Sequence, residues 1–262
     1  TTLSGAGNWL FLACFIWILV SAALMTPDFL SLRFLSRVHY VSTILMLTPL
    51  VAVLGAKRPG VRVWNFFVVI PMLGMLNWPL IAELFGSVGN EQLSLEPPAL
   101  LGAGVVLMMV LGNYFGTIFT APALLYCFGV AVSLSISSES LPHISDSLLR
   151  VRGLGGICLG LSLWWALRTY QSEQTKRTGY ERVWLDFRDW FGILWTRRVM
   201  ERLNQTAEQE QWGCRLTLEG IEWQPDLSEA HRQSTLEKMD HSFRWMFRRF
   251  VDEVWIDERL SA

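Results

Sequence analysis

The first 167 residues of the chain contain few charged side chains. They carry seven Lys or Arg and six Asp or Glu, whereas the last 95 residues hold the remaining fifteen basic and seventeen acidic groups. A soluble domain of ~160 residues has about a quarter of its residues charged, so the first part lacks the composition of a soluble domain. The net charge of the chain is −1, so it has no excess of the basic residues that bind nucleic-acid phosphates. We therefore expect no nucleic-acid partner.

Motifs of catalysis and metal binding are missing as well. The four cysteines form no CxxC pair, so neither a disulfide framework nor a zinc site is predicted. The chain has no Walker A sequence, no GxGxxG, no HExxH and no GxSxG. We therefore expect a protein that is not an enzyme and that has no resident cofactor.

Six apolar blocks occupy the weakly charged part. A helix needs ~20 apolar residues to cross the hydrocarbon core of a bilayer, and the blocks approach this length. The sequence thus predicts an all-α polytopic membrane protein with about six transmembrane helices and a small, mainly helical C-terminal cytoplasmic domain. The predicted spans are residues 8–25, 38–56, 63–85, 98–112, 117–135 and 152–168, followed by a linker at 169–179 and a tail domain at 180–262.

Basic residues near the apolar blocks predict the orientation. Lys57, Arg58 and Arg62 lie between the second and third blocks, and Arg168 follows the sixth. We expect both places in the cytoplasm together with both termini, and a bacterial inner (plasma) membrane as the location. Four arginines fall on the outer side in this orientation. Their long side chains are expected to snorkel to the membrane interface, and they are Arg33, Arg37, Arg150 and Arg152.

Prolines interrupt the third and fifth blocks. Pro71 and Pro79 lie in the third block and Pro122 in the fifth, and proline in a membrane helix frees a carbonyl and kinks the helix. Residues 98–135 are either two short spans joined by an uncharged turn or one bent, re-entrant element. Broken helices also build transport sites, so a small-molecule permease is one functional hypothesis.

Polar membrane positions provide a second kind of candidate site. Asn77 and Glu83 cluster where the third block leaves the membrane. Ionisable groups in a membrane are candidates for proton or cation sites, but Glu83 lies at the predicted boundary, which favours a solvated helix end. No charged residue lies at the centre of any block, which counts against transport.

The sixth block is rich in small residues. Gly156 and Gly160 form a GxxxG pattern, which allows another helix backbone to approach closely. That helix belongs either to this chain or to a partner subunit. Trp164 and Trp165 mark the end of the block, at the depth where aromatic side chains meet lipid headgroups.

The tail contains an aromatic amphipathic helix. Between residues 180 and 203, large apolar side chains recur at three- and four-residue steps, with arginines and aspartates in between. The apolar face is expected to lie on the cytoplasmic membrane surface or a partner, or to form the core of a small domain with residues 214–223 and 236–256. These two expectations are compatible. The aromatic residues concerned are Trp184, Phe187, Trp190, Phe191 and Trp195.

Two histidines suggest a haem or metal site. His39 starts the second block on the outer side, and His143 lies in the outer loop before the sixth. This layout resembles that of the six-helix haem-handling proteins of cytochrome c maturation, and the resemblance implies a haem ligated by the two imidazoles. It covers no motif, because the tryptophan-rich outer segment of those proteins has no counterpart in residues 86–98, which contain no Trp.

These observations lead to three functional hypotheses. The first is a non-enzymatic assembly, scaffold or accessory subunit of an inner-membrane complex. Its partners are the lipid bilayer and other membrane-protein subunits or a second copy of the chain. The alternatives are the permease and the haem-handling protein.

Overall fold

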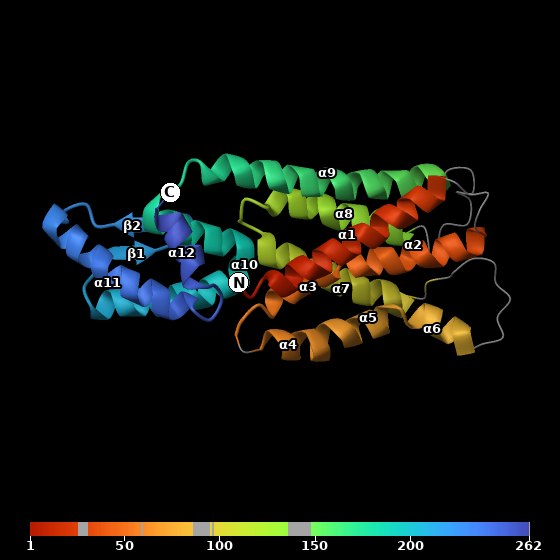
Figure 1. The fold of residues 1–262 in the computed structure, drawn as a ribbon, viewed down its shortest axis with the longest axis horizontal. Coiled ribbons are helices and arrows are strands. Elements are labelled where there is room, and N and C mark those ends of the chain that lie inside the picture. Colours follow the sequence, from red (N-terminus) through yellow and green to blue (C-terminus); the bar gives the residue numbers. More distant parts are fainter. Residues whose placement is uncertain (26–30, 59, 86–94, 96, 136–147, 262) are drawn as a thin grey trace.

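The molecule is elongated, with a bundle of long helices at one end and a compact tail at the other (Figure 1). The computed structural model describes residues 1–25, 31–58, 60–85, 95, 97–135 and 148–261. These residues are mostly helical, which confirms the helical class expected from the sequence. His143 and most of the expected outer loops lie outside the described residues.

The helices of the bundle run back and forth between its two ends (Figure 1). Their closest packing is between α8 and α9, and α1 packs on both α2 and α3. Close approach of α8 and α9 needs small side chains, and a Cβ at Gly155 would lie 2.3 Å from the Ser133 hydroxyl oxygen. The elements are α1 (Ser4–Met25), α2 (Leu32–Met46), α3 (Thr48–Leu54), α4 (Val61–Trp64), a π-helical segment (Asn65–Val69), α5 (Ile70–Leu76), α6 (Trp78–Phe85), α7 (Pro97–Tyr114), α8 (Thr120–Ser135) and α9 (Leu148–Gln174).

Prolines lie at the breaks in these helices. Pro49 stands in the first turn of α3 and Pro71 in the first turn of α5. Pro79 stands in the first turn of α6, directly after Asn77 ends α5. Because proline has no backbone N–H to donate, it is tolerated where a new helix begins and disrupts a helix interior. Within residues 63–85, Pro71 thus follows the π-helical segment, and Pro79 begins a new helix after the turn at Asn77.

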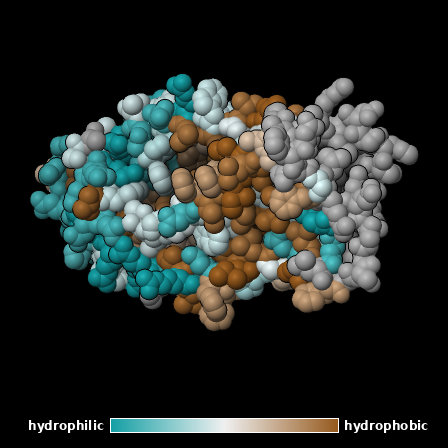
Figure 2. Space-filling view, turned by 45° about the vertical axis from the view of Figure 1, so that its right-hand side comes forward, coloured by the Kyte–Doolittle hydropathy of each residue, from teal (hydrophilic) through white to brown (hydrophobic). Residues whose placement is uncertain are grey.

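Three helical stretches are long and apolar enough to cross a membrane, namely Ser4–Ala23, Phe34–Leu54 and Pro97–Tyr114. Val61–Leu76 and Thr120–Ser135 are apolar but shorter. Figure 2 shows hydrophobic residues gathered over the bundle and hydrophilic residues over the tail. The other three expected spans, 63–85, 117–135 and 152–168, are not among the stretches that meet this criterion.

Residues 169–179, expected to be a polar linker, include the last turns of α9. Helix α9 continues to Gln174, and Arg177 is already buried. The tail consists of α10 (Gly179–Gln209), an antiparallel hairpin of β1 (Cys214–Leu216) and β2 (Ile221–Trp223), α11 (Glu229–Phe247) and α12 (Glu253–Leu260). Helix α10 is kinked at Gly192, whose backbone has φ 78° and ψ 176°.

Candidate functional site

The kink in α10 holds a side chain from the bundle. The Asn113 amide at the end of α7 accepts a hydrogen bond from the Leu194 backbone N–H at 3.2 Å and donates one to the Phe191 carbonyl at 3.4 Å. A Cβ on Gly192 would lie 2.2 Å from the Asn113 amide nitrogen. Residue 192 is therefore glycine for two reasons: its backbone conformation is accessible mainly to glycine, and Asn113 occupies the adjacent space. Both hydrogen-bond partners of the Asn113 amide are therefore in the tail.

Further hydrogen bonds attach the tail to the same end of the bundle. The Trp195 indole N–H donates to the Leu54 carbonyl at 3.1 Å, so the last turn of α3 is held against α10. The Thr2 hydroxyl lies 2.8 Å from both the Ala56 and the Phe250 carbonyl oxygens. The guanidinium of Arg58 pairs with the Asp252 carboxylate. The tail thus contacts the start of α1, the end of α3 and the end of α7.

A buried network of charged side chains lies beside this joint. The Asp189 carboxylate is fully buried and accepts from Arg177 at 2.7 Å and from Arg188 at 2.8 Å. Asp186 accepts from Arg259 at 2.8 Å and from Arg177 at 3.4 Å. Burial raises the pKa of Asp186, while the guanidiniums of Arg259 and Arg177 oppose that rise. Three arginines therefore surround two aspartates, and Arg177 also lies 3.9 Å from the partly exposed carboxylate of Glu173.

This network was missed at the level of the sequence. The sequence pattern placed arginines and aspartates between the apolar positions of residues 180–203 and gave them no partner. In the structure every residue from Val183 to Asp189 is buried, because the aromatic side faces the tail core and the charged side faces Arg177 and Arg259. The charges of opposite sign at positions 186, 188 and 189 were the feature of the sequence that could have indicated a network of ion pairs.

Most of the expected aromatic face of α10 forms the tail core. Trp184, Phe187 and Phe191 are fully buried, and Phe187 packs against Phe247 with ring centroids 4.5 Å apart. These three rings thus lie in the core of the tail, which is one of the two places expected for the aromatic face. Trp195 is also buried and contacts the bundle through its indole N–H.

The remaining aromatic candidates are exposed. Trp164 and Trp165 are 57% and 45% exposed on α9, and the Arg168 guanidinium lies 5.7 Å from the Trp164 ring. Trp190 is half-exposed and meets the Tyr170 ring edge-on at 5.4 Å. These positions suit side chains that meet lipid headgroups or a partner.

The two glycines of the GxxxG pattern differ in their surroundings. A Cβ at Gly156 would lie 2.9 Å from the Trp17 ring of α1, so this glycine allows packing within the chain. A Cβ at Gly160 would meet nothing within 4 Å. The close contact of α9 with α8 passes through the neighbouring Gly155, which the pattern did not single out.

Glu83 forms an ion pair across the bundle. Its carboxylate lies 2.8 Å from the Arg37 guanidinium, and both side chains are about one-fifth exposed. Glu83 is therefore not simply a solvated helix end, and Arg37 has a partner in the chain. The nearby Asn77 donates its amide N–H to the Leu73 carbonyl at 2.8 Å, whereas its amide oxygen is buried and has no hydrogen-bond partner.

His39 lies two turns inside α2 rather than at the start of a span. It is buried, and its backbone carbonyl accepts hydrogen bonds from the Ser42 and Thr43 hydroxyls at 2.7 and 2.9 Å. His143 lies outside the described residues, so the proposed pair stays a prediction. Among the residues that the structure describes, no three His, Cys, Asp or Glu side chains are grouped to hold a metal ion.

No family model, no curated protein and no solved structure matches the chain. The geometry of the joint and of the surfaces around it therefore carries the functional argument alone.

Proposed function

We propose that this chain is a non-enzymatic integral membrane protein that acts as an assembly, scaffold or accessory subunit of a membrane complex. The observation that carries the proposal is the attachment of the tail. Asn113 inserts into the α10 kink, and Trp195 binds the last turn of α3. A tail held at several points keeps its outer surface at a constant place relative to the bundle, which is what a docking platform requires.

The charged groups of the tail support the same role. Asp186 and Asp189 are enclosed and paired with arginines, so they stabilise the tail and are not exposed to a substrate. The surface of α9 instead offers exposed apolar side chains and the open Gly160, which suit contact with another membrane helix.

We further propose that the chain crosses the membrane six times with both termini and the tail in the cytoplasm of a bacterium. The start of α1 and the ends of α3, α7 and α9 all meet the tail, as six antiparallel crossings require. Lys57, Arg58 and Arg62 lie at that same end, in agreement with the excess of basic residues on the cytoplasmic side. A fluorescent protein fused to the C-terminus should fluoresce, and alkaline phosphatase inserted within residues 86–94 should be active. The reverse pattern would overturn this orientation.

The subunit role is tested by the mass of the native particle. The tagged full chain is extracted in mild detergent, and the particle is measured by native mass spectrometry. We expect a stable complex with another membrane protein or with a second copy. A wild-type chain that runs alone under these conditions contradicts the proposal.

Two glycine variants make this experiment specific. Gly160→Leu adds bulk to an open position of α9, so it should dissociate the complex while the chain itself stays folded. Gly104→Leu adds the same bulk to an open position of α7 and serves as the matched control. Equal effects of both variants would count against α9 as the contact.

The permease and haem hypotheses gain no specific support. Pro71 is exposed on the bundle whereas Pro122 is buried, so the two prolines do not line one cavity. Haem binding by His39 and His143 stays a prediction that a Soret absorption band, lost in His39→Ala, would test.

A further inference from the structure

A cavity of about 330 Å³ opens where the tail meets the bundle. Its inner wall is apolar and includes the buried rings of Trp195 and Phe250. Its rim carries Lys57 from the loop after α3, Arg198 and Arg202 from α10, and Arg249 from the end of α11. The cavity therefore brings together cations that are up to 192 positions apart in the chain (Lys57 to Arg249).

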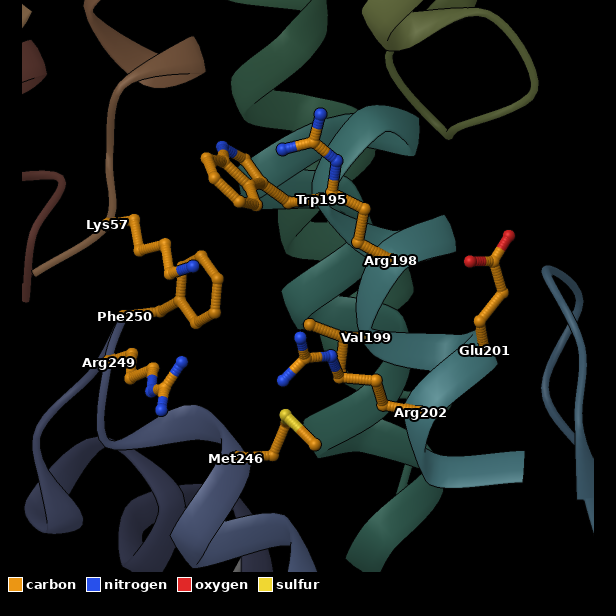
Figure 3. Close-up of a pocket in the computed structure, with 9 residues that line it drawn as sticks. All are labelled: Lys57, Trp195, Arg198, Val199, Glu201, Arg202, Met246, Arg249 and Phe250. Carbon is orange, nitrogen blue, oxygen red and sulfur yellow. The ribbon is translucent and has the colours of Figure 1, made fainter. Parts of the chain in front are cut away.

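The rim is strongly basic. Figure 3 shows Lys57, Arg202 and Arg249 extending toward the open space, while the carboxylate of Glu201 points away on the other side of α10. Lys57 and Arg198 lie over the Trp195 ring, at 5.6 and 5.2 Å from its centroid. Among the described residues, no carboxylate lies within salt-bridge distance of any of the four cations. Such a site favours an anion with several oxygens, because guanidinium groups bind phosphate through paired hydrogen bonds.

The position of the cavity indicates where that anion comes from. Lys57 follows the candidate span Phe34–Leu54 by three residues, and the Trp195 indole binds the Leu54 carbonyl at its end. The cavity therefore lies at the depth of the lipid headgroups if this span crosses a bilayer. Tryptophan is enriched at that depth, and basic residues there attract anionic lipids.

We propose that this cavity binds the phosphate group of an anionic phospholipid headgroup. The bound phosphate joins Lys57 of the bundle to Arg202 and Arg249 of the tail, so the lipid adds one more attachment between the two parts. The proposal rests on the membrane location of the chain but not on its role as a subunit.

The test uses the full chain in a neutral detergent and dioctanoyl phosphatidylglycerol as the probe. Native mass spectrometry at increasing lipid concentration gives the apparent Kd for the first bound lipid. The pocket variant is Arg202→Gln with Arg249→Gln, and the control is Arg197→Gln with Arg215→Gln, two exposed arginines outside the cavity. Both double variants change the net charge equally, so non-specific attraction affects them alike.

We expect the pocket variant to bind the lipid about tenfold or more weakly, since each basic side chain contributes substantially to anionic lipid binding. The control should bind like the wild type, and dioctanoyl phosphatidylcholine should bind weakly to all of them. Lys57→Gln, on a different element, should weaken binding in the same direction. It takes the place of the double variant if thermal unfolding shows that the latter is not folded.

Several results would overturn the proposal. If the pocket and control variants bind the lipid equally weakly, the loss of affinity comes from the change in net charge and not from the cavity. Equal affinity for phosphatidylcholine would remove the role of the anionic headgroup. Displacement of the lipid by millimolar inorganic phosphate or glycerol phosphate would make the ligand a soluble phosphate compound instead.

Discussion

The Asn113 side chain occupies the space that a side chain on residue 192 would need. Its amide satisfies the Leu194 N–H and the Phe191 carbonyl at the α10 kink, where the helix leaves backbone groups without a helical partner. One residue at the end of α7 thereby determines where α10 bends. The joint between bundle and tail depends on this pair, and it provides the first test.

Gly192→Ala should destabilise the protein through this joint. Alanine in the Gly192 conformation is strained by about 1–3 kcal/mol, and its methyl group would also displace Asn113. Thermal unfolding in detergent measures the loss, and proteolysis near residue 192 should become faster. Gly104→Ala is the control, since it fills open space in a regular helix and should be neutral or stabilising by about 0.5–1 kcal/mol.

The same pair should show non-additive behaviour. Asn113→Ala leaves the Leu194 N–H buried without its acceptor, which costs about 1–3 kcal/mol. In that background Gly192→Ala meets no side chain from α7, so only backbone strain remains. The double variant is therefore expected to be more stable than the sum of the single effects indicates. Simple additivity would show that the two residues are not coupled.

Loss of Asp189 should be severe. Asp189→Leu leaves the buried Arg177 and Arg188 without their shared acceptor, and breaking such a pair costs about 3–5 kcal/mol. Arg177 keeps the more distant Asp186 at 3.4 Å, so adding Arg177→Met should recover only a small part of the lost stability in chemical denaturation. Lys176→Ala breaks only an exposed pair with Glu173 and should change stability by less than about 0.5 kcal/mol.

Arg37 and Glu83 should behave as a unit. Arg37→Met and Glu83→Met each leave one charge unpaired between α2 and α6, so each should lower the melting temperature in detergent. The double Met variant should be more stable than either single variant. If both single variants are as stable as the wild type, the ion pair is not structural, and Glu83 returns as a candidate ion site.

The Cys214 thiol provides a pH-dependent test in the tail. Burial raises the pKa of Cys214 from its ordinary 9.0 to about 11. The folded state thus favours the neutral thiol, so the stabilisation is complete below pH 9 and is lost as pH rises toward and through 11. Alkylation by iodoacetamide, followed by peptide mass spectrometry, should be slow at pH 8 and accelerate up to about pH 11. Labelling at pH 8 as fast as in denaturant would contradict the raised pKa.

Much of the architecture follows from local properties of the sequence. Apolar blocks predict helices in the bundle, because backbone groups buried in lipid have no water to bond and must pair within a helix. Pro49, Pro71 and Pro79 stand where helices restart, since proline cannot donate a backbone hydrogen bond. The period of residues 180–203 predicts a helix with an aromatic face.

The sequence could not determine which residues pack against each face of a helix. A periodic pattern shows that one side of a helix is apolar, but the covering surface comes from residues far away in the chain. Phe187 packs on Phe247, and Asp189 pairs with Arg177 on the opposite side, so both faces of α10 are buried. The basic cavity arises in the same way, from cations on three separate elements.

By itself, then, the sequence determined the division into an apolar bundle and a charged tail, the helices, their breaks and the end at which basic residues gather. These features depend on hydropathy, proline positions and charge, which are properties of short stretches of the chain. Only the tertiary structure decided that the tail is attached to the bundle. Asn113 and Leu194 are 81 positions apart, and their contact depends on how the helices pack together.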